Sequence, residues 1–132
     1  MTVEQKMNWL RRVLIVKAVL TVVIWGLPAL LIPLSILELL KLPIPAEPVY
    51  LRLFGGAVTA WGIAYWLASR DPLRNTAIVQ AGLVDNALPT LVVVFFTFAR
   101  GLSSVFMWIS GLLTSVFFIL FLVLMPRQKY GR

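Results

Sequence analysis

The sequence predicts an all-α integral membrane protein, in which four transmembrane helices form a bundle and both termini lie in the cytoplasm. Hydrophobic residues make up 61% of the 132 residues. The mean hydropathy is +0.94, and soluble domains contain only roughly 45–50% apolar residues. The apolar residues fall in four long runs with basic residues beside their ends, as in polytopic membrane proteins. The length fits a single membrane domain, residues 1–132.

The first helix is expected at about residues 11–34. Its apolar run extends from Val13 to Leu37, well beyond the roughly 7–15 residues of a signal-peptide core, so we predict an uncleaved span. Gly26, Pro28 and Pro33 are expected to kink or end this helix in its outer half. Lys17, near the inner end, is expected to extend toward the membrane surface. Residues 38–48 contain three prolines and predict a stiff outer loop.

The second helix is expected at about residues 49–69 and has two kinds of surface. At helical spacing, the bulky residues Phe54, Val58, Trp61 and Tyr65 form one stripe. Much of the remaining surface carries small residues, which let helix backbones approach closely within a membrane. We therefore predict helix packing at these small residues, with room for a ligand or lipid tail as the alternative. The packing residues on this helix are Gly55, Gly56, Thr59 and Gly62.

The third and fourth helices are expected at about residues 72–98 and 105–125. Asp71 followed by Pro72 is a favourable helix start, with an N-cap acceptor before a proline. On the fourth helix, Gly111 and Ser115 mark the packing side. The third helix is polar along one side and apolar along the other, so its polar side is predicted to face protein. That polar side comprises Gly82, Asp85, Asn86, Pro89, Thr90 and Thr97.

Asp85 is the only acidic residue deep within an apolar run. It lies roughly 13–15 Å along the helix from Thr76, near the middle of a hydrocarbon core of about 30 Å. Together with Asn86, Thr90 and Lys17, it defines a candidate intramembrane polar site. One hypothesis is an interhelical hydrogen bond that holds the bundle together, worth about 0.6–2 kcal/mol. The other is a proton or cation site, or an anchor for a polar head group.

Two basic residues are candidate partners for Asp85. Lys17 reaches outward from the inner half of the membrane, and Arg52 reaches inward from the outer end. Lys17 is the closer of the two in depth. A carboxylate within the membrane needs such a partner, because an unpaired charge there is costly.

The orientation follows from the distribution of Lys and Arg. Nine of the twelve basic residues lie in the N-terminal segment including Lys17, the middle loop and the C-terminal tail. The other three are Lys41, Arg52 and Arg100. Basic residues concentrate on the cytoplasmic side, so both termini are predicted to be cytoplasmic. The expected location is the bacterial inner membrane.

The composition narrows the chemistry that the chain supports. It contains neither Cys nor His, which removes thiol nucleophiles, thiolate metal sites and imidazole ligands. No phosphate loop or dinucleotide fingerprint is present. We expect no catalytic residue, no metal site and no cofactor, and therefore no enzyme. The basic residues flank apolar runs, which favours membrane lipids rather than nucleic acid or a soluble substrate as contacts.

Two segments of the second helix and the turn after it read Leu-Arg-Leu-Phe-Gly-Gly from Leu51 and Tyr-Trp-Leu-Ala-Ser-Arg-Asp-Pro from Tyr65. Over about 25 residues this region resembles the small four-helix bacterial membrane proteins of the DoxX-like and BphX-like groups. The resemblance implies the same architecture. Some members of those groups look like accessory subunits of redox or degradative systems, but no catalytic residue is implied for this chain.

Two functions from different classes are consistent with the sequence. The first is an accessory or structural subunit of a larger membrane complex, such as an energy-transducing or redox assembly, in contact with other integral membrane subunits. Its small size and the small residues on its helix faces favour this hypothesis. The alternative is a small transporter or channel that works as a homo-oligomer, with Asp85, Asn86, Thr90 and Lys17 along a polar path.

Overall fold

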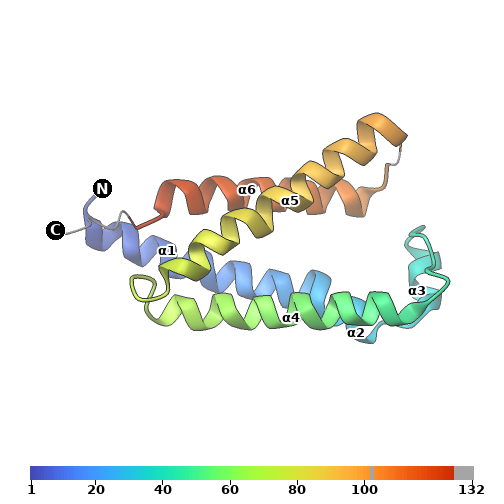
Figure 1. Ribbon diagram of the computed structural model, residues 1–132, viewed down its shortest axis with the longest axis horizontal. Coiled ribbons are helices and arrows are strands. Elements are labelled where there is room, and N and C mark those ends of the chain that lie inside the picture. Colours follow the sequence, from blue (N-terminus) through green and yellow to red (C-terminus); the bar gives the residue numbers. More distant parts are fainter. Residues whose placement is uncertain (102, 127–132) are drawn as a thin grey trace.

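The computed structural model describes residues 1–101 and 103–126. Within these residues every regular element is a helix (Figure 1), which confirms the all-α prediction. The elements are α1 (Val3–Leu20), the π-helical segment η1 (Thr21–Gly26), α2 (Leu27–Leu31), α3 (Leu34–Leu39), α4 (Pro48–Arg70), α5 (Thr76–Arg100) and α6 (Val105–Leu124).

Three helical stretches of the described residues are long and apolar enough to cross a membrane. They are Val3–Leu31, Thr76–Arg100 and Val105–Leu124. These stretches indicate a membrane protein. The 23-residue helix α4 is also long enough, at about 1.5 Å per residue, to cross a hydrocarbon core of about 30 Å. It is less apolar than the others because it contains Arg52, several glycines and Arg70.

Two helices begin at different residues from those expected. The first begins at Val3 instead of about residue 11, because Thr2 and Gln5 form a capping box. Gln5 N–H donates to Thr2 Oγ1 at 3.2 Å, and Thr2 N–H donates to Gln5 Oε1 at 2.9 Å. The third long helix begins at Thr76 instead of residue 72, because Asp71 Oδ1 accepts the N–H of Arg74 and closes a separate turn.

The remaining boundaries lie closer to the expected ranges. α4 extends one residue further at each end than residues 49–69, and α6 ends one residue before 125. The expected outer loop of residues 38–48 overlaps the end of α3, which continues to Leu39.

The first span is interrupted where its prolines predicted a kink. η1 precedes Pro28, which has no N–H and whose ring would meet the carbonyl of Ile24 in a regular α-helix. The N–H of Leu27 instead bonds the carbonyl of Val22, five residues back. α2 ends at Leu31, before Pro33. A wide π turn therefore accommodates the proline within the span.

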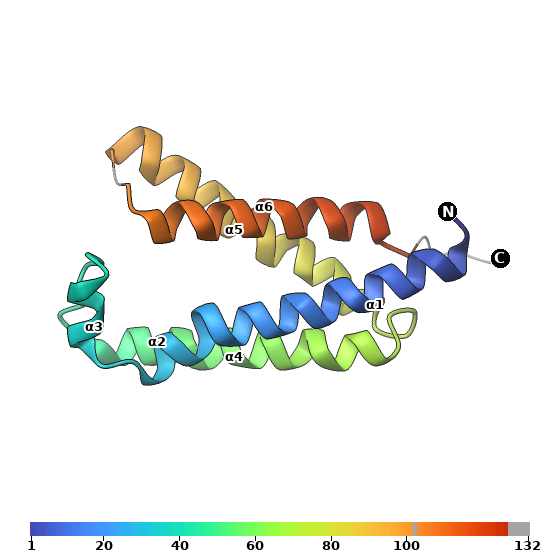
Figure 2. The same cartoon turned by 180° about the vertical axis from the view of Figure 1, so that it is seen from behind.

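The helices form two antiparallel pairs in two layers. α1, η1 and α2 pack along α4, and α5 packs along α6 (Figures 1 and 2). The layers meet through contacts of α1 with α6 and of α4 with α5. The start of α1, the turn between α4 and α5 and the end of α6 lie at one end of the molecule. α3 and the turn between α5 and α6 lie at the other end.

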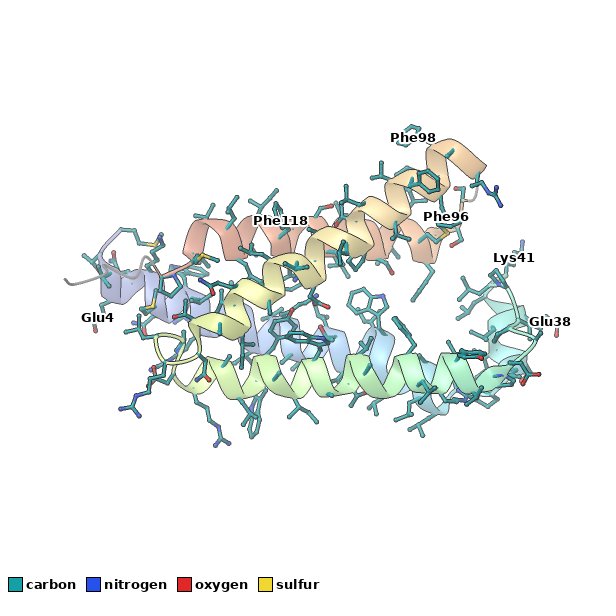
Figure 3. All side chains as sticks on the ribbon, viewed as in Figure 1. Glu4, Glu38, Lys41, Phe96, Phe98 and Phe118 are labelled. Carbon is teal, nitrogen blue, oxygen red and sulfur yellow. The ribbon has the colours of Figure 1, made fainter. Side chains whose placement is uncertain are left out.

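The hydrophobic core occupies the half of the molecule nearest the start of α1, which we call the packed half. Its centre is formed by completely buried side chains from all four long helices: Leu10, Leu14, Tyr65, Val79 and Phe121. The rings of Tyr65 and Phe121 lie 5.7 Å apart between centroids. The half toward α3 contributes few buried side chains, and we call it the open half. Its Phe98, near the end of α5, points away from the molecule (Figure 3) and is 82% exposed.

Small residues of α4 meet the first span at close range. A Cβ atom on Gly55 would overlap the backbone of Ala29 and Leu30, and one on Gly62 would overlap the Val22 side chain. Thr59 lies against Gly26, where an added Cβ would be 2.5 Å from Thr59 Oγ1.

The other predicted packing residues lie in two different environments. Gly56 has nothing within 4 Å of its Cβ position, so it lies outside this contact. In the other layer, a Cβ on Gly111 would lie 2.9 Å from Val93, and Ser115 Oγ donates to the Gly111 carbonyl at 2.7 Å.

Candidate functional site

Four side chains from three helices form a polar cluster at the boundary between the packed half and the open half. Lys17 of α1 donates from Nζ to Asn86 Oδ1 at 2.7 Å. The same nitrogen lies 4.0 Å from Asp85 Oδ2. Tyr65 of α4 donates its hydroxyl to Asp85 Oδ2 at 2.6 Å. Lys17, Tyr65, Asp85 and Asn86 thus join the α1–α4 layer to α5, and we refer to them as the polar cluster.

Asn86 fixes the position of the lysine. Its Nδ2 donates to the carbonyl of Gly82 at 2.7 Å, so its Oδ1 is turned toward Lys17. The residue is completely buried, and both ends of its amide are satisfied. Asp85, by contrast, keeps 28% of its side chain exposed. The carboxylate therefore faces the open half while the amide faces the packed half.

The ammonium group of Lys17 is surrounded by aromatic rings. Its Nζ lies 5.1 Å from the ring centre of Phe117 and 5.7 Å from those of Trp25 and Tyr65. Such rings attract a cation in a desolvated site. The expectation that Lys17 extends to the membrane surface is wrong, because the residue is only 3% exposed and points into the protein. The amide of Asn86 and the three surrounding rings hold the ammonium inside the protein.

The structure brings three of the four predicted site residues together and places the fourth beside them. Thr90 donates to the carbonyl of Asn86 at 2.9 Å and lies 2.8 Å from Thr114 Oγ1 of α6. It therefore links α5 to α6 and does not contact Lys17. Arg52, the alternative partner for Asp85, instead donates to the carbonyls of Ala29 and Ile32 at 3.0 and 2.7 Å, at the end of α2.

Sequence reasoning missed Tyr65 as a member of this site. It assigned the tyrosine to the bulky stripe of α4, where the ring indeed packs, and overlooked its hydroxyl. A fully buried tyrosine needs a partner for its hydroxyl, because an unsatisfied buried donor is costly. Asp85 is the acceptor, and this pairing depends on how α4 and α5 lie against each other.

A cleft of about 500 Å³ opens between the two layers, directly beyond the polar cluster. Its walls are largely apolar and aromatic, and the bulky stripe of α4 forms one of them. Trp25 Nε1 donates to Ser110 Oγ at 2.9 Å across the cleft. The lining residues on α1, η1 and α4 are Lys17, Thr21, Trp25, Phe54, Val58 and Trp61. Those on α5 and α6 include Asp85, Leu88, Pro89, Val92, Met107 and Thr114.

The end of the cleft nearest the packed half, which we call its floor, lies against the polar cluster. Lys17 and Thr21 are only 3% and 4% exposed there, whereas Asp85 keeps 28% of its side chain exposed and is the charged group that opens to the cleft. Beyond the cluster lies the fully buried core around Leu14, Tyr65 and Phe121. Pro89 has no N–H to give to the carbonyl of Asp85, four residues earlier, so a backbone acceptor is also freed beside the floor. The arrangement is an apolar cleft that ends blindly on a few polar groups, which is the usual form of a small-molecule site.

Comparison with known proteins gives no further assignment: no protein-family model, curated protein or solved structure matches this chain.

Proposed function

We propose that this protein is a non-catalytic accessory subunit of a membrane assembly, and that it holds a largely apolar, membrane-soluble molecule between its two helix layers. The observation that carries the proposal is the cleft of about 500 Å³, with largely apolar walls and the Asp85 carboxylate at its floor. Sites for small molecules typically have this volume and this composition. The resemblance of α4 to the DoxX-like and BphX-like groups also favours an accessory role.

The proposed setting is a bacterial inner membrane, with α4 as a fourth span and both termini in the cytoplasm. Two contacts support α4 as a span. The first span, made of α1, η1 and α2, packs along one side of α4. The carbonyls of Ala29 and Ile32 in and after α2 accept hydrogen bonds from Arg52, so that this charged side chain has partners. The start of α1 and the α4–α5 turn, which carry most of the basic residues in the described part of the chain, lie at the same end.

A transporter or channel is the second candidate, favoured by the meeting of Lys17, Asp85 and Asn86 deep within the helices. The core beyond the floor favours binding over transport, because the fully buried side chains of Leu14, Tyr65 and Phe121 pack against that end of the cleft. Flux of protons or cations into vesicles that contain the protein, lost in Asp85→Asn, would favour transport instead.

The proposal is tested by gentle purification of the tagged protein from its native membranes. Mass spectrometry would identify the co-purified proteins and the molecules in an organic extract. We expect larger membrane proteins in stoichiometric amounts, together with an enriched apolar molecule. A homogeneous homo-oligomer without partners would overturn the subunit role.

A matched pair of variants tests binding in the cleft. Val58→Phe would fill the cleft from α4, whereas Ile63→Phe adds the same ring on an exposed face of α4. We expect the enriched molecule to be lost in Val58→Phe and kept in Ile63→Phe. Equal enrichment in both variants would overturn the cleft as the binding site.

A further inference from the structure

The carboxylate of Asp85 opens to the cleft with part of its hydrogen-bonding capacity unused. Its side chain lines the cleft and is 28% exposed. A carboxylate has about four acceptor positions on its two oxygens, and the hydroxyl of Tyr65 takes one of them, on Oδ2. Lys17 Nζ lies 4.0 Å from the same oxygen, too far for a hydrogen bond. The carboxylate can therefore accept further hydrogen bonds.

The second oxygen, Asp85 Oδ1, accepts no hydrogen bond from the residues that the structure describes. It is also not sealed inside the protein. The buried side-chain polar atoms that lack a partner in this part of the chain are the hydroxyls of Thr21 and Thr97, and Oδ1 is not one of them. The Thr21 hydroxyl and the Lys17 side chain are closed off beside it. Oδ1 is thus the acceptor that a molecule in the cleft can reach.

A backbone acceptor lies on the same face of α5. Pro89 gives no N–H to the carbonyl of Asp85, and both residues line the cleft one helical turn apart. A molecule that pairs with these acceptors must bring a donor of its own. Hydrocarbon alone would leave the carboxylate oxygen without a donor inside an apolar cleft, which is costly.

The charges on the floor favour a neutral donor. Lys17 and Asp85 form an ion pair, so the two side chains balance each other. A cationic ligand would add an uncompensated positive charge within the apolar cleft, and an anionic ligand would meet the carboxylate, where a lone ion is costly. A neutral O–H group can donate to Oδ1 without changing the charge, and hydrogen bonds to a carboxylate are the stronger kind.

The walls of the cleft suit an apolar body behind such a head group. Trp25, Trp61 and Phe54 line them with aromatic surface. The indole of Trp25 is held in place, because its Nε1 donates to Ser110 Oγ of α6 at 2.9 Å. The cleft therefore combines one charged acceptor at the floor with apolar surface above it, which corresponds to a molecule that is polar at one end only.

We infer that the cleft takes a neutral amphiphilic alcohol whose hydroxyl donates a hydrogen bond to Asp85 Oδ1 while its apolar part lies between Trp25, Trp61 and Phe54. This inference rests on the proposed binding function and adds the chemistry of the head group. A long-chain alcohol and a polycyclic ring alcohol share this chemistry.

The test uses the purified full-length protein in a mild detergent without hydroxyl groups, and probes that differ only in the head group. Native mass spectrometry would measure the binding of hexadecanol, its methyl ether, hexadecylammonium and palmitate. The ether keeps the oxygen and the chain but has no donor. We expect hexadecanol to bind about 10-fold or more tightly than the ether, as for a hydrogen bond to a charged acceptor. Both charged probes should bind more weakly than hexadecanol.

A second pair of probes separates the two sources of the hydroxyl. Cholesterol and its methyl ether repeat the comparison on a rigid ring skeleton. We expect the alcohol to be preferred over the ether on the skeleton that fits the cleft, and this skeleton identifies a chain or a ring ligand. Absence of that preference on both skeletons would overturn the inference.

A matched pair of variants tests whether Asp85 is the acceptor. Asp85→Asn removes the charge at the floor, and Asp71→Asn makes the same change in the turn after α4, where the side chain is 46% exposed and does not line the cleft. We expect the preference for hexadecanol over the ether to fall to about 3-fold or less in Asp85→Asn. Asp71→Asn should keep the full preference.

A double variant keeps the test decisive if Asp85→Asn does not fold. Lys17→Met with Asp85→Leu replaces both members of the ion pair with apolar side chains, a change that a fold often tolerates. This double variant should bind the alcohol and the ether equally. A preference for the alcohol that survived there would overturn Asp85 as the acceptor.

The outcomes separate this inference from the proposed function. Equal binding of hexadecanol and the ether to the natural protein, with the same result for cholesterol, would overturn the head-group assignment and leave the apolar cleft standing. Failure of every probe to bind a monodisperse protein would overturn both. Tighter binding of hexadecylammonium or of palmitate than of hexadecanol would show that the floor takes an ion, and it would overturn the neutral head group.

Discussion

At the scale of single residues, the polar cluster stabilises two charged side chains, Lys17 and Asp85, inside a helical membrane protein. Asn86, Asp85 and three aromatic rings surround the Lys17 ammonium. Each of these contacts replaces part of the water that the ammonium would have at a surface. The cluster therefore stabilises the Lys17 ammonium inside the protein, next to the cleft, so the side chain does not extend to the membrane surface.

Tyr65→Phe should destabilise the bundle, because it removes the hydroxyl that donates to Asp85 and leaves the packed ring in place. We expect a loss of about 1–2 kcal/mol in the free energy of unfolding, measured by SDS titration in mixed micelles. Tyr50→Phe is the control, since that tyrosine is 71% exposed. Equal stability of the two variants would show that the hydrogen bond contributes nothing to the fold.

Asp85→Asn should cost more than its small change of shape suggests. It removes the negative partner of Lys17 and leaves a buried ammonium uncompensated, at about 1–3 kcal/mol or more. Lys17→Met in the same chain should recover part of that loss, because the unpaired charge is then gone. Unfolding measurements on both single variants and the double variant give the coupling. Additive losses would contradict an ion pair.

At the scale of helices, the contact between α4 and the first span depends on which glycine lies at the interface. Gly55 meets the backbone of Ala29 and Leu30, whereas its neighbour Gly56 meets nothing. Backbone moves aside less readily than a flexible side chain, so a larger residue at position 55 would have to push α2 away from α4. From the sequence alone both glycines are expected to pack against another helix. Only the contact with α2 shows that Gly55 does so and that Gly56 does not.

Gly55→Ala and Gly56→Ala form a matched pair that tests this contact. Gly55→Ala should destabilise the protein by about 1–3 kcal/mol, because α2 must move away from α4. Gly56→Ala should be neutral or stabilising by up to about 1 kcal/mol, since alanine favours helix. The measurement is the free energy of unfolding of each variant. If Gly56→Ala were the more destabilising of the two, α4 would pack through its other face.

At the scale of the whole molecule, the two layers join tightly at one end and separate toward the other. Core side chains fill the packed half, and the cleft occupies the open half, with the polar cluster between them. Glu4 and Lys41 mark the two ends in Figure 3. The orientation of this long axis in the membrane determines to which side of the membrane the open half, with the cleft, lies.

Single cysteines test the orientation directly, because the natural chain contains none. Lys41→Cys, beside α3, should react with a membrane-impermeant maleimide in intact cells. Asn75→Cys, in the turn between α4 and α5, should react only after the membrane is opened. This pattern follows from an N-in, four-span topology. Reaction of Asn75→Cys in intact cells would overturn that topology.

The sequence by itself determined the all-helical class, the presence of apolar spans, the break near Pro28 and the inward location of the polar side of α5. Each of these depends on local chemistry: apolar length, helical period, or the missing N–H of a proline. Helix starts were less well predicted, because capping by Thr2 and the turn at Asp71 depend on side-chain hydrogen bonds that compete with other local choices.

Only the tertiary structure decided which groups meet. That Lys17 points inward, that Tyr65 bonds Asp85, and that Gly55 rather than Gly56 lies at a contact all depend on how helices far apart in the sequence lie side by side. The cleft and the unpaired hydroxyl of Thr21 have the same origin. The physical reason is that a helix has a fixed period but no fixed neighbour, so the sequence gives each face its character and packing selects its partner.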